Sequence, residues 1–386
     1  MASVQSSSAR ARLHRGMAAW PLRVWYAPAS ASPAGPFLTP LLRLAGKLYV
    51  GGLHLHQRLL RSRRCRLQAY VISVGNLVVG GTGKTPFTLW LADYVWRRGL
   101  PAAVLSRGYG RDSGGVAMVP HEGETALNAR RFGDEPALMA RKAPHISVWV
   151  GRDRASSGRE AIRMTGARVL LLDDGFQHLA LDRDLDFVLL DAQNPFGNGC
   201  LLPLGPLREP IHHLDRAHAI VLTRARSSTE TRSTISMLEE HFPNKPVFVC
   251  RHRLSGFRAG LDGPDVPIDL VRSGIVVAFT GIGRPRSFFR SLRESGIQPA
   301  ECIDFPDHHR YSPRDISFLL DVLRQHGARF LVTTEKDMVR LPAEIQSRTL
   351  ATGLELDFGS QTPHIHAYLD GKLPLAEIPP NYRVDP

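Results

Sequence analysis

The sequence predicts an α/β protein: a phosphate-loop (P-loop NTPase-like) α/β/α sandwich with a second, smaller α/β domain. Two observations carry this prediction. The apolar run from Val71 to Val74 leads into a glycine-rich loop and then into a helical pattern that opens at Lys84. A second alternation of short apolar runs and helical patterns begins at Gly274. The expected parts are a basic extension at 1–66, a P-loop domain at 67–225, a connector at 226–272 and the smaller α/β domain at 273–386.

Length and charge narrow the class of protein. With 386 residues and 43% hydrophobic content, the chain is long enough to bury two cores. The net charge is +13, and no Asp or Glu occurs between Met1 and Ala92. This asymmetry predicts an anionic partner for the N-terminal end, either a membrane surface or a nucleic acid, and a solvated basic tail is the alternative. The four cysteines are far apart in sequence, so neither a zinc site nor a disulfide framework is indicated.

The basic extension contains a candidate membrane-associating helix. From Pro40 to Leu60, leucines alternate with basic and polar residues at roughly helical spacing, interrupted by three glycines. Such a segment lies in the interface of an anionic bilayer or packs on the protein's own core. The uncharged stretch from Val24 to Leu42 contains four prolines and is not expected to span a bilayer. Residues 1–23 are rich in Ser, Ala and Arg, so a cleaved transit peptide is an alternative.

The glycine-rich loop has the features of a phosphate cradle. Backbone N–H groups without neighbouring side chains converge on phosphate oxygens, and the N-terminus of the following helix adds its positive dipole end. A lysine there reaches the outer phosphates, and a threonine hydroxyl holds Mg²⁺. The usual phosphate-loop pattern has glycine at its first position, whereas this chain has Val78 there. The expected nucleotide-binding residues are Val78, Val79, Gly80, Gly81, Thr82, Gly83, Lys84 and Thr85.

Three further segments carry candidate chemistry. Arg107 follows a short strand, at the end where open parallel sheets bind ligands. Asp134 and Glu135 open a helix, where acids also serve as simple caps. Asp173 and Asp174 end a hydrophobic strand, which is the expected place for a carboxylate that orients Mg²⁺, although a surface turn would look similar. The long Gly- and Pro-rich segment 194–210 is expected to be a functional loop.

Taken together, the motifs resemble the tetraacyldisaccharide 4'-kinases, which phosphorylate the lipid A precursor. The resemblance runs in order from about Leu41 to Leu341. Its motifs are Ser73-Val74-Gly75-Asn76-Leu77 before the glycine-rich loop, Ser106-Arg107-Gly108-Tyr109-Gly110, Gly133-Asp134-Glu135-Pro136, Asp173-Asp174-Gly175-Phe176-Gln177-His178, Phe196-Gly197-Asn198-Gly199, Pro203-Leu204-Gly205-Pro206-Leu207-Arg208-Glu209, Asp307-His308 and Thr333-Thr334-Glu335-Lys336-Asp337.

The resemblance implies phosphoryl transfer from ATP, with Mg²⁺, to the 4'-hydroxyl of a lipid-linked glucosamine disaccharide. It implies that Asp134 is the general base, that His308 is coupled to it across a domain cleft that must close, and that Lys84 neutralises the phosphates. Thr85 and one of Glu135 and Asp173 would hold the metal. The residues expected to bind the disaccharide and its 1-phosphate are Arg107, Asp174, Gln177, His178 and Arg208.

The family also implies a peripheral location at the cytoplasmic face of the bacterial inner membrane, with organelle targeting as the alternative if residues 1–23 are a transit peptide. We expect no nucleic-acid partner and no obligate protein partner. Two other functions are weighed: a P-loop NTPase that binds nucleic acid, motivated by the charge, and a nucleotide-dependent switch without a lipid acceptor.

Overall fold

The computed structural model describes residues 24–26, 35–226 and 229–374. The basic residues before position 24 and the proposed transit peptide lie outside these ranges. Contacts divide the chain into two compact units. Unit 1 comprises Met1–Ser106, Asp153–Arg251 and Asp357–Pro386, and unit 2 comprises Arg107–Arg152 and His252–Leu356.

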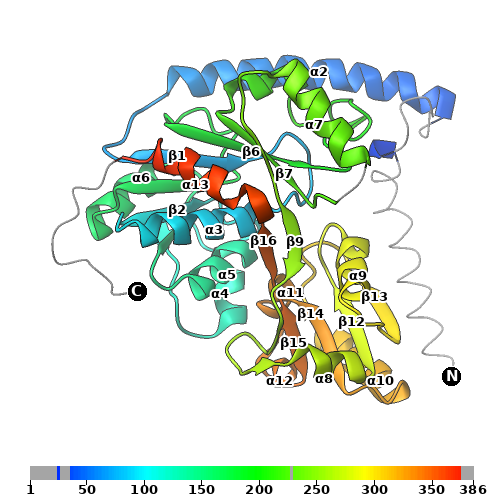
Figure 1. The fold of residues 1–386 in the computed structure, drawn as a ribbon. Coiled ribbons are helices and arrows are strands. Elements are labelled where there is room, and N and C mark those ends of the chain that lie inside the picture. Colours follow the sequence, from blue (N-terminus) through cyan, green and yellow to red (C-terminus); the bar gives the residue numbers. More distant parts are fainter. Residues whose placement is uncertain (1–23, 27–34, 227–228, 375–386) are drawn as a thin grey trace. The chain divides into compact units, whose positions relative to one another are not determined.

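Unit 1 is built on a parallel sheet with strand order β2-β5-β1-β6-β7-β8 (Figure 1). Its central strands are continuous apolar runs, as expected for parallel strands that are buried on both faces. This is the P-loop α/β/α sandwich that the sequence predicts. The strands are β1 (Tyr70–Gly75), β2 (Ala102–Ser106), β5 (Val169–Asp173), β6 (Leu185–Asp191), β7 (Ala219–Thr223) and β8 (Val247–Val249).

Helices of unit 1 connect and flank these strands. The glycine-rich loop follows β1, and its helix begins at Lys84 as predicted. The C-terminal segment returns to this unit, where α13 packs against α3 through Tyr94 and Asp370. The helices are α2 (Gly35–Ser62), α3 (Lys84–Arg97), α6 (Arg154–Thr165), η1 (Ile211–Arg216), α7 (Thr229–His241), η2 (Gly359–Gln361) and α13 (Thr362–Asp370).

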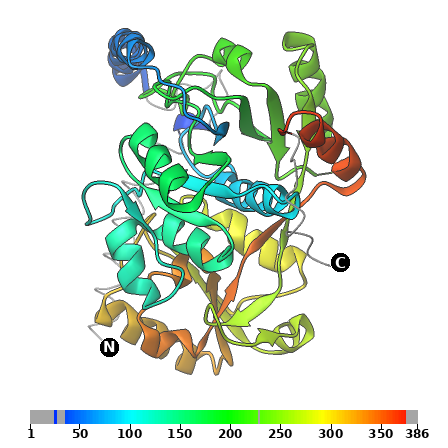
Figure 2. The ribbon, with the colours of Figure 1, turned by 90° about the vertical axis from the view of Figure 1, so that its left-hand side faces the viewer.

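The predicted amphipathic helix is present as α2, the long helix at the top of Figure 1, which Figure 2 shows almost end-on. It is continuous over 28 residues, although the sequence suggested interruption at its glycines. The exposed leucines fall at intervals of three, four and seven residues and therefore share one side of the helix. We call this side the leucine face: Leu41, Leu44, Leu48, Leu55 and Leu59.

No helix within the described ranges is both long enough and apolar enough to cross a membrane.

Unit 2 contains the second α/β sheet that the sequence predicts, with strand order β11-β10-β15-β14-β12-β13. Strands β13, β12, β14 and β15 are parallel, and β10 and β11 are antiparallel additions. A short antiparallel pair, β3 and β4, also belongs to this unit. The strands are β3 (Ala117–Met118), β4 (Ser147–Val150), β10 (Phe257–Ala259), β11 (Asp265–Val266), β12 (Val276–Thr280), β13 (Glu301–Asp304), β14 (Phe330–Thr334) and β15 (Thr349–Thr352).

The helices of unit 2 are short, and two of them bring the Asp134 segment onto the second sheet. Side chains of α4 and α5 pack with Val339 and Leu261 in one apolar cluster. The unit boundaries fall within two strands that pair with each other, β9 (Arg251–Leu254) and β16 (Leu354–Asp357). The helices are α4 (Thr125–Phe132), α5 (Asp134–Lys142), α8 (Ile268–Ser273), α9 (Pro285–Glu294), α10 (Pro313–Gln325), α11 (Glu335–Met338) and α12 (Ala343–Gln346).

The two units differ from the expected domain boundaries in three respects. Residues 107–152 belong to unit 2, although they were expected in the P-loop domain. Residues 357–374 belong to unit 1, although they were expected in the smaller domain. The expected connector at 226–272 contains α7, β8 and strands of the second sheet. The sequence-based prediction assumed that each domain is one continuous segment, whereas the chain alternates between the two units.

Candidate active site

The phosphate loop connects the end of β1 to the start of α3. Gly80 and Gly83 have positive φ angles of 112° and 87°, which residues other than glycine rarely adopt. A Cβ atom added at Gly80 would meet nothing within 4 Å, so the loop is open at that point. Gly83 is also the N-cap of α3 and offers no side chain to its first N–H groups. These groups are the donors that a phosphate requires.

Neighbouring side chains hold the loop in this shape. The Asn76 amide donates to the backbone oxygen of Gly80 (3.3 Å) and to Thr82 Oγ1 (3.1 Å). From the end of β7, Thr223 Oγ1 donates to the oxygen of Thr82 (2.8 Å), and Arg224 Nη2 donates to the oxygen of Gly81 (2.6 Å). No sequence motif pointed to Thr223 or Arg224, because their contact with the loop depends on the order of strands.

Val78 and Val79 play different parts from the glycines. Val78 is buried in the apolar core of unit 1 and forms an antiparallel bridge with Leu207. The N–H of Val79 donates to the oxygen of Pro206 (2.8 Å). The first half of the loop is therefore fastened to the segment 206–208. A valine at this position contributes packing, which explains why glycine is not needed there.

Strand register brings the two aspartates beside the phosphate loop. Val74 of β1 is paired with Asp173 of β5, so both strands end at the same edge of the sheet. Asp173 is buried and accepts a hydrogen bond from Thr88 Oγ1 (3.2 Å) in α3. Asp174, with a positive φ of 52°, lies 3.6 Å from Lys84 Nζ. Of the two acids, Asp174 forms an ion pair with Lys84, and Asp173 is joined to α3 through Thr88.

Asp174 is the centre of a small charge cluster. Arg208 Nη1 donates to both of its carboxylate oxygens (3.1 and 3.0 Å) and to Gln177 Oε1 (3.3 Å). Burial by itself would raise the pKa of Asp174, but Lys84 and Arg208 outweigh it and lower the pKa to about 2. Gln177 Nε2 in turn donates to the oxygen of Asn76 (2.9 Å).

His178 follows in the same turn, where its backbone oxygen accepts from Arg183 (3.4 Å). The structure thus places Lys84, Thr85, Asp173, Asp174, Gln177, His178 and Arg208 in unit 1.

The other expected residues lie in unit 2. Asp134 begins α5 directly after Gly133, whose φ is 102°. His308 Nδ1 lies 2.9 Å from Asp134 Oδ2, and the backbone N–H of His308 donates to the oxygen of Gly281 (3.1 Å). His308 has a φ of 57°, an uncommon conformation for this residue that often marks functional sites. The two residues were expected to come from different domains, but both belong to unit 2.

Arg340 supports the Asp134–His308 pair and has no counterpart in the sequence prediction. Its Nε lies 3.5 Å from Asp134 Oδ2. Its other guanidinium nitrogens donate to the backbone oxygens of His309 (3.2 Å) and Gly281 (3.0 Å), and to the buried carboxylate of Asp337 (2.6 Å). The position of Arg340, three residues after Asp337 in the turn that follows α11, was the available signal.

Glu135 and Arg107 differ from the other expected residues. Glu135 forms an ion pair with Lys336, whose pKa burial would lower but Glu135 raises. A metal role for Glu135 would therefore require it to share its carboxylate with a lysine. Arg107 is exposed immediately after β2.

The carboxylates near Lys84 are a suitable donor set for Mg²⁺, which prefers oxygen ligands and commonly binds through one or two carboxylates, waters and phosphates. Asp173 and the hydroxyl of Thr85 fit this description. Within the described residues, no cluster of three or more His, Cys, Asp or Glu side chains is arranged to hold a metal by itself.

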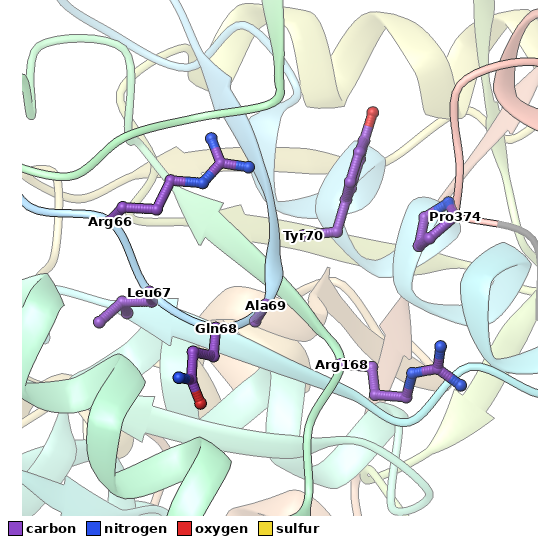
Figure 3. A pocket seen from close by; sticks show the side chains of 7 residues that line it. All are labelled: Arg66, Leu67, Gln68, Ala69, Tyr70, Arg168 and Pro374. Atoms are coloured by element: carbon purple, nitrogen blue, oxygen red, sulfur yellow. The ribbon is translucent and has the colours of Figure 1, made fainter.

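A surface pocket lies at the opposite edge of the unit 1 sheet, where β1 and β5 begin (Figure 3). Arg66, Tyr70 and Arg168 line it together with Pro374. Because the phosphate loop follows the end of β1, this pocket is separate from the Lys84 cluster.

A model of the family "Tetraacyldisaccharide-1-P 4'-kinase" matches residues 38–374. The chain is 47% identical to a tetraacyldisaccharide 4'-kinase of Syntrophobacter fumaroxidans over 95% of this chain and 96% of the relative. It is 41% identical to one of Pelobacter propionicus over 79% of this chain and 83% of the relative.

A solved structure is also similar: that of LpxK from Aquifex aeolicus in complex with ATP. The TM-score is 0.66 at 30% identity, over 86% of this chain and 99% of that one. The matches cover both units and every motif described above. The chain belongs to the tetraacyldisaccharide-1-phosphate 4'-kinase family.

Proposed function

We propose that this protein is an ATP-dependent lipid kinase that phosphorylates the 4'-hydroxyl of a tetraacyldisaccharide 1-phosphate in lipid A biosynthesis. The observation that carries the proposal is family membership over both units, together with a phosphate loop whose Lys84 pairs with Asp174, which also pairs with Arg208. The similarity to an ATP-bound family member supports ATP as the phosphoryl donor. No observation favours a nucleic-acid-binding NTPase or a switch without a lipid acceptor.

The residues of unit 1 bind and neutralise the nucleotide. The N–H groups of the loop and the N-terminus of α3 hold phosphate oxygens, and Lys84 balances their negative charge. Thr85 and Asp173 would hold Mg²⁺, which neutralises charge on the phosphates when bound. Asp174 stays ionised because Lys84 and Arg208 lower its pKa. It keeps the two cations in place.

Unit 2 supplies the proposed general base for the acceptor. The oxygen of the 4'-hydroxyl forms a bond to the γ-phosphorus, the bond from that phosphorus to the bridging oxygen breaks, and ADP leaves. The hydroxyl proton passes to the carboxylate of Asp134, which His308 and Arg340 orient. Arg107, Arg208, Gln177 and His178 are proposed to bind the disaccharide and its 1-phosphate. The arginines suit phosphate because their guanidinium groups donate two parallel hydrogen bonds.

The leucine face of α2 is the proposed contact with the membrane that contains the lipid substrate. Its leucines are exposed, and basic residues such as Arg43, Lys47 and Arg58 are exposed on the same helix. A helix of this kind lies in the headgroup region of an anionic bilayer. Together with the lipid A precursor as proposed substrate, this helix supports a peripheral location at the cytoplasmic face of the bacterial inner membrane.

A transfer assay tests the proposal directly. ATP labelled in its γ-phosphate is incubated with the protein and a tetraacyldisaccharide 1-phosphate in mixed micelles, and the lipid fraction is separated and counted. We expect label in the lipid and no transfer when the 4'-position is already phosphorylated. ATP turnover that does not depend on the lipid would instead support a nucleotide-dependent switch.

A further inference from the structure

Two polar side chains of α2 contact the segment at Arg208 and Glu209, and Arg208 in turn contacts Asp174 beside Lys84. Tyr49 donates from its hydroxyl to the backbone oxygen of Arg208 (2.7 Å). Gln57 donates from Nε2 to Glu209 Oε2 (3.1 Å). The two side chains are eight residues apart, slightly more than two turns, and thus project from the same side of the helix. Neither belongs to the leucine face.

Glu209 is fixed by its buried surroundings. Its side chain is fully buried, and Oε2 also lies 2.6 Å from His213 Nδ1 and 2.7 Å from Arg216 Nη2. A buried carboxylate is stable only when such partners surround it. Gln57 is the one partner in this group that comes from α2. It therefore couples the position of the helix to the position of the Glu209 backbone.

The segment 206–209 also forms backbone hydrogen bonds with the phosphate loop. The N–H of Arg208 donates to the oxygen of Leu77 (2.7 Å), next to the Val78–Leu207 bridge. The Arg208 guanidinium then extends to both oxygens of Asp174. Residues 206–209 are thus held between α2 and the phosphate loop, all within unit 1.

We propose that Tyr49 and Gln57 are positioning residues for phosphoryl transfer, acting through Arg208. They fix the backbone from which the Arg208 guanidinium reaches Asp174. In this way they hold the charged groups of Arg208, Asp174 and Lys84 at fixed positions beside the phosphate loop. The proposal rests on the proposed role of Arg208 and Asp174 in the kinase. It gives α2 a second task that is independent of its contact with lipid.

The test uses the full chain with Gln57→Met, which keeps the length of the side chain but removes its donor, and with Tyr49→Phe. Small displacements of catalytic groups cost about ten- to a hundredfold in rate, so we expect a decrease in kcat of that order for Gln57→Met and a smaller decrease for Tyr49→Phe. Liposome flotation should stay close to that of the unmodified protein, while the melting temperature of Gln57→Met should fall by a few degrees because the buried Glu209 carboxylate loses a donor. His56→Gln is the matched control, since its exposed neighbouring position has no part in the contacts with segment 206–209.

A double-mutant cycle separates positioning from a general structural effect. In an Arg208→Ala background, Gln57→Met should cause no further decrease in kcat, because the group it positions is gone. Two penalties that multiply, or an unchanged kcat in both Gln57→Met and Tyr49→Phe, would overturn the positioning role. A normal kcat in Arg208→Ala would overturn the proposed role of Arg208 and this inference with it. A defective Arg208→Ala beside a normal kcat in both Gln57→Met and Tyr49→Phe overturns the inference alone.

Discussion

Leu48 offers the most direct test of the proposed contact between α2 and a membrane. It is the most exposed leucine of the leucine face, at 72%. Complete burial of a leucine contributes about 1.5–3 kcal/mol, so moving the 72% exposed part of Leu48 into lipid contributes about 1–2 kcal/mol. Leu48→Gln should therefore weaken partitioning into vesicles by about five- to thirtyfold.

Flotation with vesicles that contain anionic phospholipid measures this change. Leu127→Gln is the matched control, because Leu127 is 55% exposed but lies in α4 of unit 2, whereas α2 belongs to unit 1. Binding of the unmodified protein should also fall with salt, since each basic residue near the surface contributes about 1 kcal/mol at low ionic strength. If both variants float like the unmodified protein, the leucine face is not the membrane-binding surface.

The nucleotide and acceptor sides make separable predictions. Lys84→Met should abolish transfer to the lipid while circular dichroism stays native, and near-normal activity would reject the phosphate-loop assignment. Asp134→Asn should lower kcat with little change in the KM for ATP; a rise in that KM alone would assign Asp134 to nucleotide or metal binding. Asp174→Asn addresses pH. The folded-state pKa of Asp174 is about 2, whereas an aspartate in an unfolded chain has a pKa of about 4. The ionised carboxylate therefore contributes its full stabilisation above about pH 4, and this stabilisation is lost as pH falls towards 2. In urea unfolding, the unmodified protein should exceed Asp174→Asn in stability at pH 6, and the difference should shrink towards pH 2. A difference independent of pH would contradict this account.

Local patterns predicted the elements of the nucleotide-binding half well. The run from Val71 to Val74 is strand β1, and the helix that opens at Lys84 is α3, because buried parallel strands and a glycine-rich turn leave strong local signals. Strands β4, β13 and β15 and helices α6 and α13 were not anticipated. Their apolar residues are few or interrupted by polar ones, so periodicity alone does not separate them from loops.

Contacts between distant segments could not be predicted in the same way. Motifs placed Asp134 and His308 in one reaction, but only the packing of α4 and α5 on Val339 shows why both belong to unit 2. Arg340 and Lys336 partner the expected acids from a segment about 200 residues later. The sequence contains those residues, yet the strand order that brings them near is a property of the whole fold.

The return of the chain to unit 1 has a consequence for synthesis of the protein. Tyr94 and Arg98 at the end of α3 bind Asp370 of α13, and Trp90 lies against His366. A ribosome completes these partners about 270 residues after it completes α3. Until then the aromatic side of the helix that begins with Lys84 is uncovered, which exposes apolar surface on a growing chain. We therefore expect chains that end before α13 to expose this surface and to be more prone to aggregation than the full chain.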